Sequence, residues 1–162
     1  MKTRELTRMA LLCAIALTIF MVEAQLPALT PVPGIKLGLS TIVTVYAVFV
    51  LGPKQAAAIL ACRVFLGAVF SGQMSTILYS GAGGALALAV TVLVRRVLTK
   101  KQIWIAGVLG AIAHSVGQMV VAVWVSGTPG LAAYLPVMIL AGLVSGTFTG
   151  LCAQFLVERL KL

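Results

Sequence analysis

Long apolar stretches alternate with short polar breaks along the whole chain. Stretches of this length match helices that cross a hydrocarbon core about 30 Å thick, and lipid leaves the backbone few alternatives to helical hydrogen bonding. The second and third stretches are short, which predicts a thinned or partly water-exposed region there. The pattern therefore predicts an all-α integral membrane protein with six transmembrane helices, at residues 6–26, 37–51, 55–70, 77–98, 103–125 and 131–157.

The breaks between these stretches contain residues that end helices. Three prolines and a glycine lie between residues 27 and 34, and they predict a stiff, non-helical first connection. Gly52 and Pro53 predict a tight turn between the second and third helices. Because no break exceeds roughly ten residues, we expect residues 1–162 to form a single membrane domain.

The charge pattern predicts how the helices are oriented. Hydrophobic residues make up 61% of the chain and charged residues 9%, which excludes a soluble domain of this size. A net charge of +9 would suggest nucleic acid in a soluble protein, but here the bilayer explains it better and we expect no nucleic-acid partner. The positive-inside rule predicts that both termini face the cytoplasm. Of the 12 lysines and arginines, all but Lys36 and Arg63 lie at the two ends or at alternate breaks: Lys2, Arg4, Arg8, Lys54, Arg95, Arg96, Lys100, Lys101, Arg159 and Lys161.

The residues needed for catalysis are missing from the sequence. The chain has no aspartate, and its carboxylates are Glu5, Glu23 and Glu158. There is no phosphate-binding loop of the Gly-x-x-x-x-Gly-Lys-Ser/Thr type, no acidic pair for Mg²⁺ and no nucleophile–base constellation. We therefore expect no enzymatic activity from this chain alone, no metal and no cofactor. The three cysteines lie inside apolar stretches and are interpreted as packing residues.

A few polar residues lie inside the stretches or at their far-side ends. Ionisable groups in hydrocarbon are costly and mark functional sites by default. His114 and Gln118 are one helical turn apart and share a face. We predict a pocket open to the outside, with a net positive charge that favours an anionic or zwitterionic ligand. The candidate substrate-binding residues are Glu23, Lys36, Arg63, Gln73, Tyr79, His114 and Gln118.

Alternative interpretations remain for several of these residues. Lys36 could extend to the membrane surface without touching a ligand, and Glu23 could form a salt bridge with it. His114 could be a neutral structural residue that donates to a neighbouring carbonyl. Arg63 is the hardest to explain in this way, because an arginine near the midplane needs a partner or water.

Small residues mark two faces where helices can approach closely. Ala10 and Ala14 form one face on the first helix, and Gly142, Gly146 and Gly150 form a longer one on the sixth. Such faces serve packing within the bundle or against a partner, and spacing alone favours internal packing.

Three motifs resemble one bacterial family, known as Gx transporters or as heptaprenyl diphosphate synthase component I. They are PGIKLGLS at residues 33–40, LYSGAGG at 78–84 and AHSVGQ at 113–118. The resemblance covers essentially the whole chain. Thr41 and Ser115 stand where we expect asparagine in this family, so the ligand here would differ if those asparagines contact ligand in relatives.

This family in turn resembles the S components of energy-coupling factor (ECF) transporters. The resemblance implies a six-helix bundle in the plasma membrane of a bacterium, with both termini in the cytoplasm. It also implies capture of a small nutrient from outside under a cap at residues 27–34. Partners would be a T subunit, docked on Ala10 and Ala14, and two ATPase subunits. The alternatives are a non-catalytic membrane subunit of heptaprenyl diphosphate synthase, and a scaffold or assembly factor.

Overall fold

A computed structural model describes residues 3–25 and 38–159, and these residues form helices joined by short connections. The described part contains no β-strand. The helices are α1 (Thr3–Glu23), α2 (Thr41–Val50), α3 (Pro53–Ser71), α4 (Ser75–Val94), η1 (Lys100–Gln102), α5 (Ile103–Ser126), η2 (Pro129–Tyr134) and α6 (Leu135–Arg159). The predicted all-α fold is confirmed.

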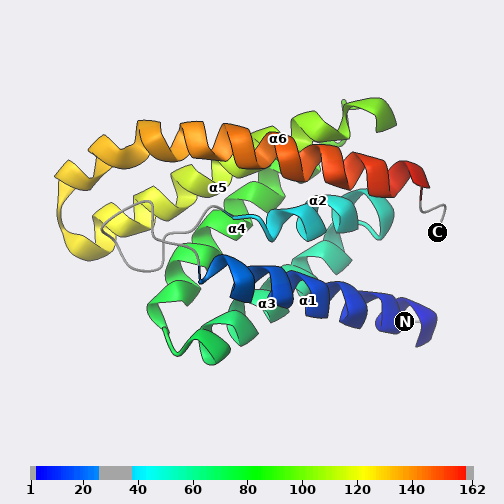
Figure 1. Cartoon of the computed structure of the whole chain (residues 1–162), viewed down its shortest axis with the longest axis horizontal. Helices are drawn as coiled ribbons and strands as arrows, with labels where there is room; N and C mark the ends of the chain where they lie inside the picture. Colours follow the sequence, from blue (N-terminus) through cyan, green and yellow to red (C-terminus); the bar gives the residue numbers. More distant parts are fainter. Residues whose placement is uncertain (1–2, 26–37, 160–162) are drawn as a thin grey trace.

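The long helices run up and down beside one another (Figure 1), so that the ends of α1 and α6 nearest the termini lie at the same end of the bundle. We call it the terminal end. The α2–α3 and α4–α5 connections reach the same end. Charges on these elements therefore gather there, as expected for the cytoplasmic side. The described residues concerned are Arg4, Arg8, Lys54, Arg95, Arg96, Lys101 and Arg159.

Five helical segments are long and apolar enough to cross a membrane, and α2 is the exception. The prediction placed a helix at residues 37–51, but α2 contains only 10 residues and rises about 15 Å. Its apolar sequence did not distinguish helix from the turn at Leu39 and Ser40 that precedes Thr41. The third predicted helix was too short: α3 begins at Pro53, a favourable first residue, and has 19 residues. The fourth ends at Val94, earlier than the predicted residue 98.

Helix α5 packs closely on α4 and α6, largely through glycines. A Cβ added at Gly107 would lie 2.4 Å from Cα of Gly150, so the backbones of α5 and α6 meet directly. A Cβ on Gly146 would lie 2.7 Å from Cβ of Ala111. The small-residue face of the sixth helix therefore serves internal packing, as expected.

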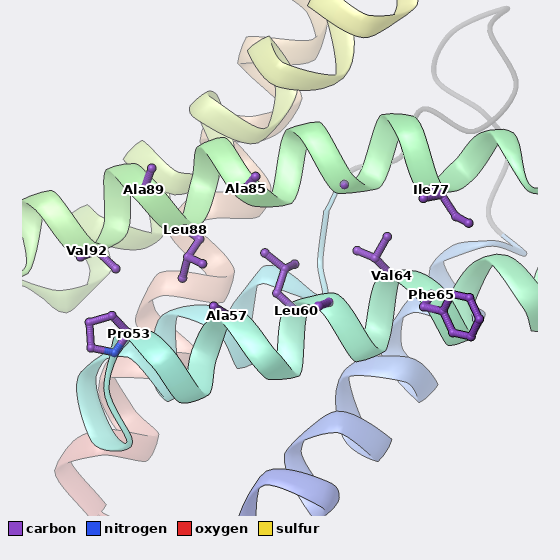
Figure 2. A pocket seen from close by; sticks show the side chains of 12 residues that line it. Pro53, Ala57, Leu60, Val64, Phe65, Ile77, Ala85, Leu88, Ala89 and Val92 are labelled. Carbon is purple, nitrogen blue, oxygen red and sulfur yellow. The ribbon is translucent and has the colours of Figure 1, made fainter.

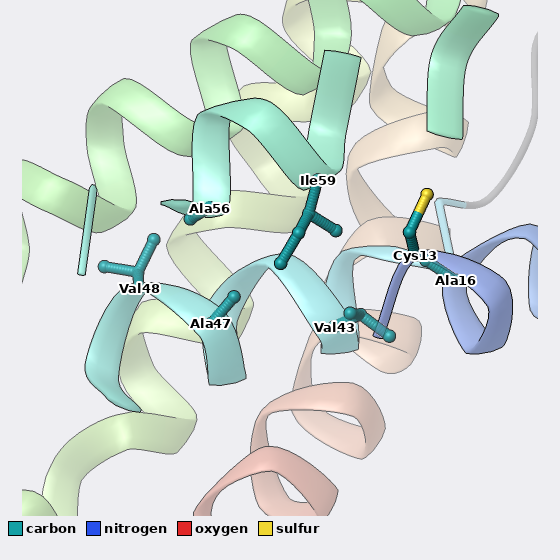
Figure 3. Close-up of a cluster of buried hydrophobic side chains, with 7 residues drawn as sticks. All are labelled: Cys13, Ala16, Val43, Ala47, Val48, Ala56 and Ile59. Atoms are coloured by element: carbon teal, nitrogen blue, oxygen red, sulfur yellow. The ribbon is translucent and has the colours of Figure 1, made fainter. Parts of the chain in front are cut away.

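Helix α2 is buried between α1 and α3. Seven buried side chains form this contact (Figure 3): Cys13, Ala16, Val43, Ala47, Val48, Ala56 and Ile59. Cys13 acts here as a small packing residue, in agreement with the sequence interpretation. This packing holds the start of α2 in place. Gly38 then lies near the C-terminal end of α1, and Ser40 lies near the middle of α3.

Candidate functional site

Buried polar side chains from α1, α3 and α5 meet around the residues that lead into α2. We call this group the polar centre. None of its side chains is more than 4% exposed. It lies in the half of the bundle away from the terminal end, where α1 ends and α2 begins. Its members are Glu23, Ser40, Arg63, His114 and Gln118, together with the backbone of Gly38.

Gly38 connects α1 to α5. Its backbone N–H donates a hydrogen bond to Oε1 of Glu23. Its Cα faces the imidazole of His114, because a Cβ added there would lie 2.9 Å from the His114 Cδ2 atom. The φ angle of 77° lies in the left-handed region, which glycine adopts without strain. Glycine at position 38 thus allows the chain to turn into α2 while the histidine ring packs against it.

Arg63 lies within α3 and projects into the polar centre. Its Nη1 donates to the Ser40 hydroxyl oxygen at 2.5 Å, and its guanidinium carbon lies 5.7 Å from the centroid of the Phe20 ring. The Glu23 carboxylate attracts the guanidinium electrostatically. The charge of the guanidinium in turn reaches the imidazole of His114. Nε and Nη2 of Arg63 are buried and make no hydrogen bond to the described residues. An arginine held this way can bind an anion with its remaining donors.

His114 and Gln118 lie one turn apart on α5, against Gly83 of α4. A Cβ on Gly83 would lie 2.8 Å from the backbone oxygen of His114 and 2.9 Å from Cγ of Gln118. The missing side chain at this position lets both residues fit between the helices. Both amide atoms of Gln118 are buried without a hydrogen-bond partner among the described residues. Gln118 therefore offers one donor group and one acceptor to a ligand.

The structure does not bring every predicted residue to the polar centre. Tyr79 is buried in a hydrophobic cluster with Met119, Ala122 and Met138. Gln73 is exposed in the connection between α3 and α4. Lys36 lies outside the described residues. No contact in the structure supports a shared site for Tyr79 and Gln73, and the binding roles of all seven candidates stay predictions.

Three residues with buried hydroxyls were not predicted as site residues. Ser40 accepts the Arg63 hydrogen bond. The hydroxyls of Thr41 and Thr76 are buried without a partner among the described residues. Ser40 lies inside the family motif at residues 33–40, which is the one signal that could have found it. A serine or threonine in an apolar stretch otherwise looks like a helix-packing residue.

Ala10 and Ala14 are exposed on one face of α1. They lie four residues apart, so they are stacked on the same side of the helix. Neither is covered by another described helix, which leaves this face available to lipid or to a partner protein. Their predicted docking role is not tested by the structure.

Two apolar cavities formed by described residues lie outside the polar centre. The larger, about 580 Å³, runs between α3 and α4 from Pro53 and Val92 at one end to Phe65 and Ile77 at the other (Figure 2). The smaller, about 240 Å³, lies between α1, α2 and α6. No group of three or more His, Cys, Asp or Glu side chains that could hold a metal occurs among the described residues.

Comparison with known families adds to this geometry. The chain matches the family model described as heptaprenyl diphosphate synthase component I over residues 12–156. It belongs to this family. No curated protein and no solved structure gives a significant match. The predicted family is confirmed, while the further resemblance to ECF S components stays a prediction.

The family description names one component of a synthase. This agrees with the prediction that a member such as this chain is not an enzyme by itself, and it implies at least one protein partner. The apolar helices support a multi-pass membrane protein.

Proposed function

We propose that this chain is a non-catalytic membrane subunit that works with a separate, soluble prenyl diphosphate synthase. The family match over residues 12–156 carries the proposal, because the family is described as a component of heptaprenyl diphosphate synthase. The composition supports the non-catalytic role. Synthesis of a prenyl diphosphate needs carboxylates that hold Mg²⁺ on the diphosphate, and this chain has three glutamates and no aspartate. The partner would supply the reacting site.

Within this proposal the polar centre binds a small anionic or zwitterionic group. Buried donors without partners cost about 1–3 kcal/mol each, so a ligand that accepts their hydrogen bonds is favoured. Arg63 and Gln118 would contact the ligand, and His114 would border it. Glu23 would keep the segment before α2 in place through Gly38. Lys36 is proposed as a second cation on the ligand.

Co-purification tests the main proposal. We would solubilise membranes gently, capture the chain through a tag and identify the bound proteins by mass spectrometry. A soluble prenyl diphosphate synthase, bound in constant proportion, is the expected result. Deletion of the chain should also abolish prenyl diphosphate synthesis, and expression of the wild-type chain should restore it. A chain that binds ATPase subunits and no synthase would contradict it.

A second candidate function is the S component of an ECF-type importer. Two observations favour it. The polar centre lies away from the terminal end, on the side that would face outward. Ala10 and Ala14 form an exposed face of small residues on α1, as a docking helix needs. In this function ATP hydrolysis on partner subunits would power uptake of a small nutrient.

Native mass spectrometry and uptake assays separate the two functions. An S component should carry a small polar molecule that is lost in Arg63→Ala. Ala10→Trp should keep this molecule bound but stop uptake, whereas Val22→Trp, at an exposed position on another side of the same helix, should affect neither. A chain that is reproducibly empty, with normal growth of Ala10→Trp cells on the limiting nutrient, would remove the importer function.

A further inference from the structure

Arg63 presents a complete two-donor edge inside the polar centre. Its Nη1 donates to the Ser40 hydroxyl, and its Nε and Nη2 are buried without a hydrogen-bond partner among the described residues. The planar guanidinium places the N–H of Nε and one N–H of Nη2 side by side, on the edge away from Nη1. Ser40 therefore occupies one corner of the group and leaves the whole of this edge for a ligand.

This edge is held in a fixed position. Arg63 is only 2% exposed, its Nη1 is tied to the residues that lead into α2, and its guanidinium carbon lies 5.7 Å from the centroid of the Phe20 ring. Two parallel N–H groups match two oxygens of a carboxylate or of a phosphate. Because the side chain is already ordered, binding such an anion costs little conformational entropy.

The charges in the polar centre favour a carboxylate over a phosphate. Arg63 and Glu23 are the described residues of the polar centre that carry a full charge at neutral pH, and the two attract each other. With Lys36 as the second cation proposed above, one positive charge remains. A carboxylate carries one negative charge and neutralises it, whereas a phosphate near neutral pH carries up to two. A buried charge without compensation is strongly unfavourable.

Gln118 adds a second requirement, which is uncharged. Its side chain is fully buried, and both Oε1 and Nε2 lack a partner among the described residues. It lies one turn from His114, which is close enough to Arg63 to feel its charge. A carboxylate or phosphate would satisfy only Nε2. A lactam, carboxamide or ureido group offers an acceptor and a donor side by side, and it therefore satisfies both atoms of the Gln118 amide.

We propose that the ligand of the polar centre is a small monocarboxylic acid that also has an amide-like edge, such as a lactam or ureido group. Its carboxylate contacts the Nε and Nη2 edge of Arg63, and its amide-like edge pairs with the side chain of Gln118. This class of ligand rests on the function proposed above, in which the polar centre binds a small anionic or zwitterionic group. It does not depend on which protein is the partner.

Equilibrium binding to the purified full chain in a neutral detergent tests this class of ligand. The probes are 5-oxoproline, orotate and N-carbamoylglycine, which each combine one carboxylate with a lactam, imide or ureido edge. Benzoate lacks the edge, uracil lacks the carboxylate, and inorganic phosphate is the competing anion. We expect at least one of the three acids to bind, and to bind at least about tenfold more tightly than each comparison compound.

Two variants test the contacts one at a time. Arg63→Lys keeps the positive charge but cannot present two parallel N–H groups, so the bound acid should lose at least about tenfold in affinity. Gln118→Met should remove detectable binding of the acid. It also removes buried atoms without partners, so it should fold at least as stably as the wild type. Gln55→Met is the control, because Gln55 bonds Glu5 outside the polar centre, and its affinity should stay within about twofold.

The outcomes separate this ligand from the proposed function. If none of the three acids binds, or if phosphate binds more tightly than they do, this class of ligand is wrong even when a synthase co-purifies. Unchanged affinity in both Arg63→Lys and Gln118→Met would also overturn it, because the acid would then bind elsewhere. Binding that depends on both residues, without any synthase partner, would keep the ligand and remove the proposed function.

Discussion

Arg63 donates a hydrogen bond from Nη1 to the hydroxyl of Ser40 at 2.5 Å, and so ties the middle of α3 to the start of α2. Both side chains are at least 98% buried. The bond uses one of the three guanidinium nitrogens and leaves Nε and Nη2 without partners among the described residues. Arg63 therefore holds the site together and still has donors for a ligand.

The charges of Arg63 and Glu23 should depend on each other. Arg63→Met would leave the buried Glu23 without the nearby cation, and we expect a loss of about 3 kcal/mol in the free energy of unfolding. The double variant Arg63→Met/Glu23→Gln should recover at least half of that loss, because the carboxylate that attracts the guanidinium is removed together with it. Thermal unfolding in detergent measures both. Additive losses in the double variant would show that the two charges are independent.

Gly38 should resist substitution for two separate reasons. In Gly38→Ala the φ of 77° strains the backbone and the new Cβ lies 2.9 Å from the His114 ring, so we expect a loss of about 2–4 kcal/mol. Gly72→Ala is the matched control. Its φ of 67° gives a similar strain of about 1 kcal/mol, but nothing lies within 4 Å of the new Cβ. Equal losses in the two variants would mean that the contact with His114 contributes nothing.

Gln118 should contribute to ligand binding and should not stabilise the fold. Both of its amide atoms lack partners among the described residues, so Gln118→Met should raise the free energy of unfolding by about 1 kcal/mol and remove ligand binding. The comparison is Gln55→Met. Nε2 of Gln55 donates to Glu5 at 2.8 Å, so its loss should lower stability slightly. A destabilised Gln118→Met would argue that the amide has a structural role. Unfolding curves and native mass spectrometry give the two readouts.

The orientation in the membrane can be tested with single cysteines. In a background where Cys13, Cys62 and Cys152 are replaced by alanine, Gly130→Cys should react with a membrane-impermeant maleimide on intact cells. Arg96→Cys should react only after the cells are opened, because basic ends stay in the cytoplasm. Both positions are exposed, and a Cβ at Gly130 meets nothing within 4 Å. The reverse labelling pattern would show that the protein has the opposite orientation in the membrane.

Apolar stretches and basic breaks are enough to predict the class of fold and an orientation in the membrane. These signals depend on the transfer of side chains into lipid and on charge near its surface, which are properties of each segment alone. The same reasoning identifies Arg63, Glu23, His114 and Gln118 as candidate site residues. An ionisable or amide group inside an apolar stretch is recognisable from the sequence whichever way the helix faces. It also identifies the glycines of the sixth helix as a packing face.

Contacts between distant segments could not be obtained in this way. Which helix faces meet depends on how closely the two backbones can approach. Pairs of glycines on different helices, such as Gly107 and Gly150, allow the closest approach. One sequence does not show which glycines form such a pair. The shortness of α2 is a related case, since apolar residues before Thr41 are compatible with several backbone conformations. Because α2 is short and α1 and α6 stay apart, Gly38 meets His114 in the polar centre and an apolar cavity is left between α1, α2 and α6.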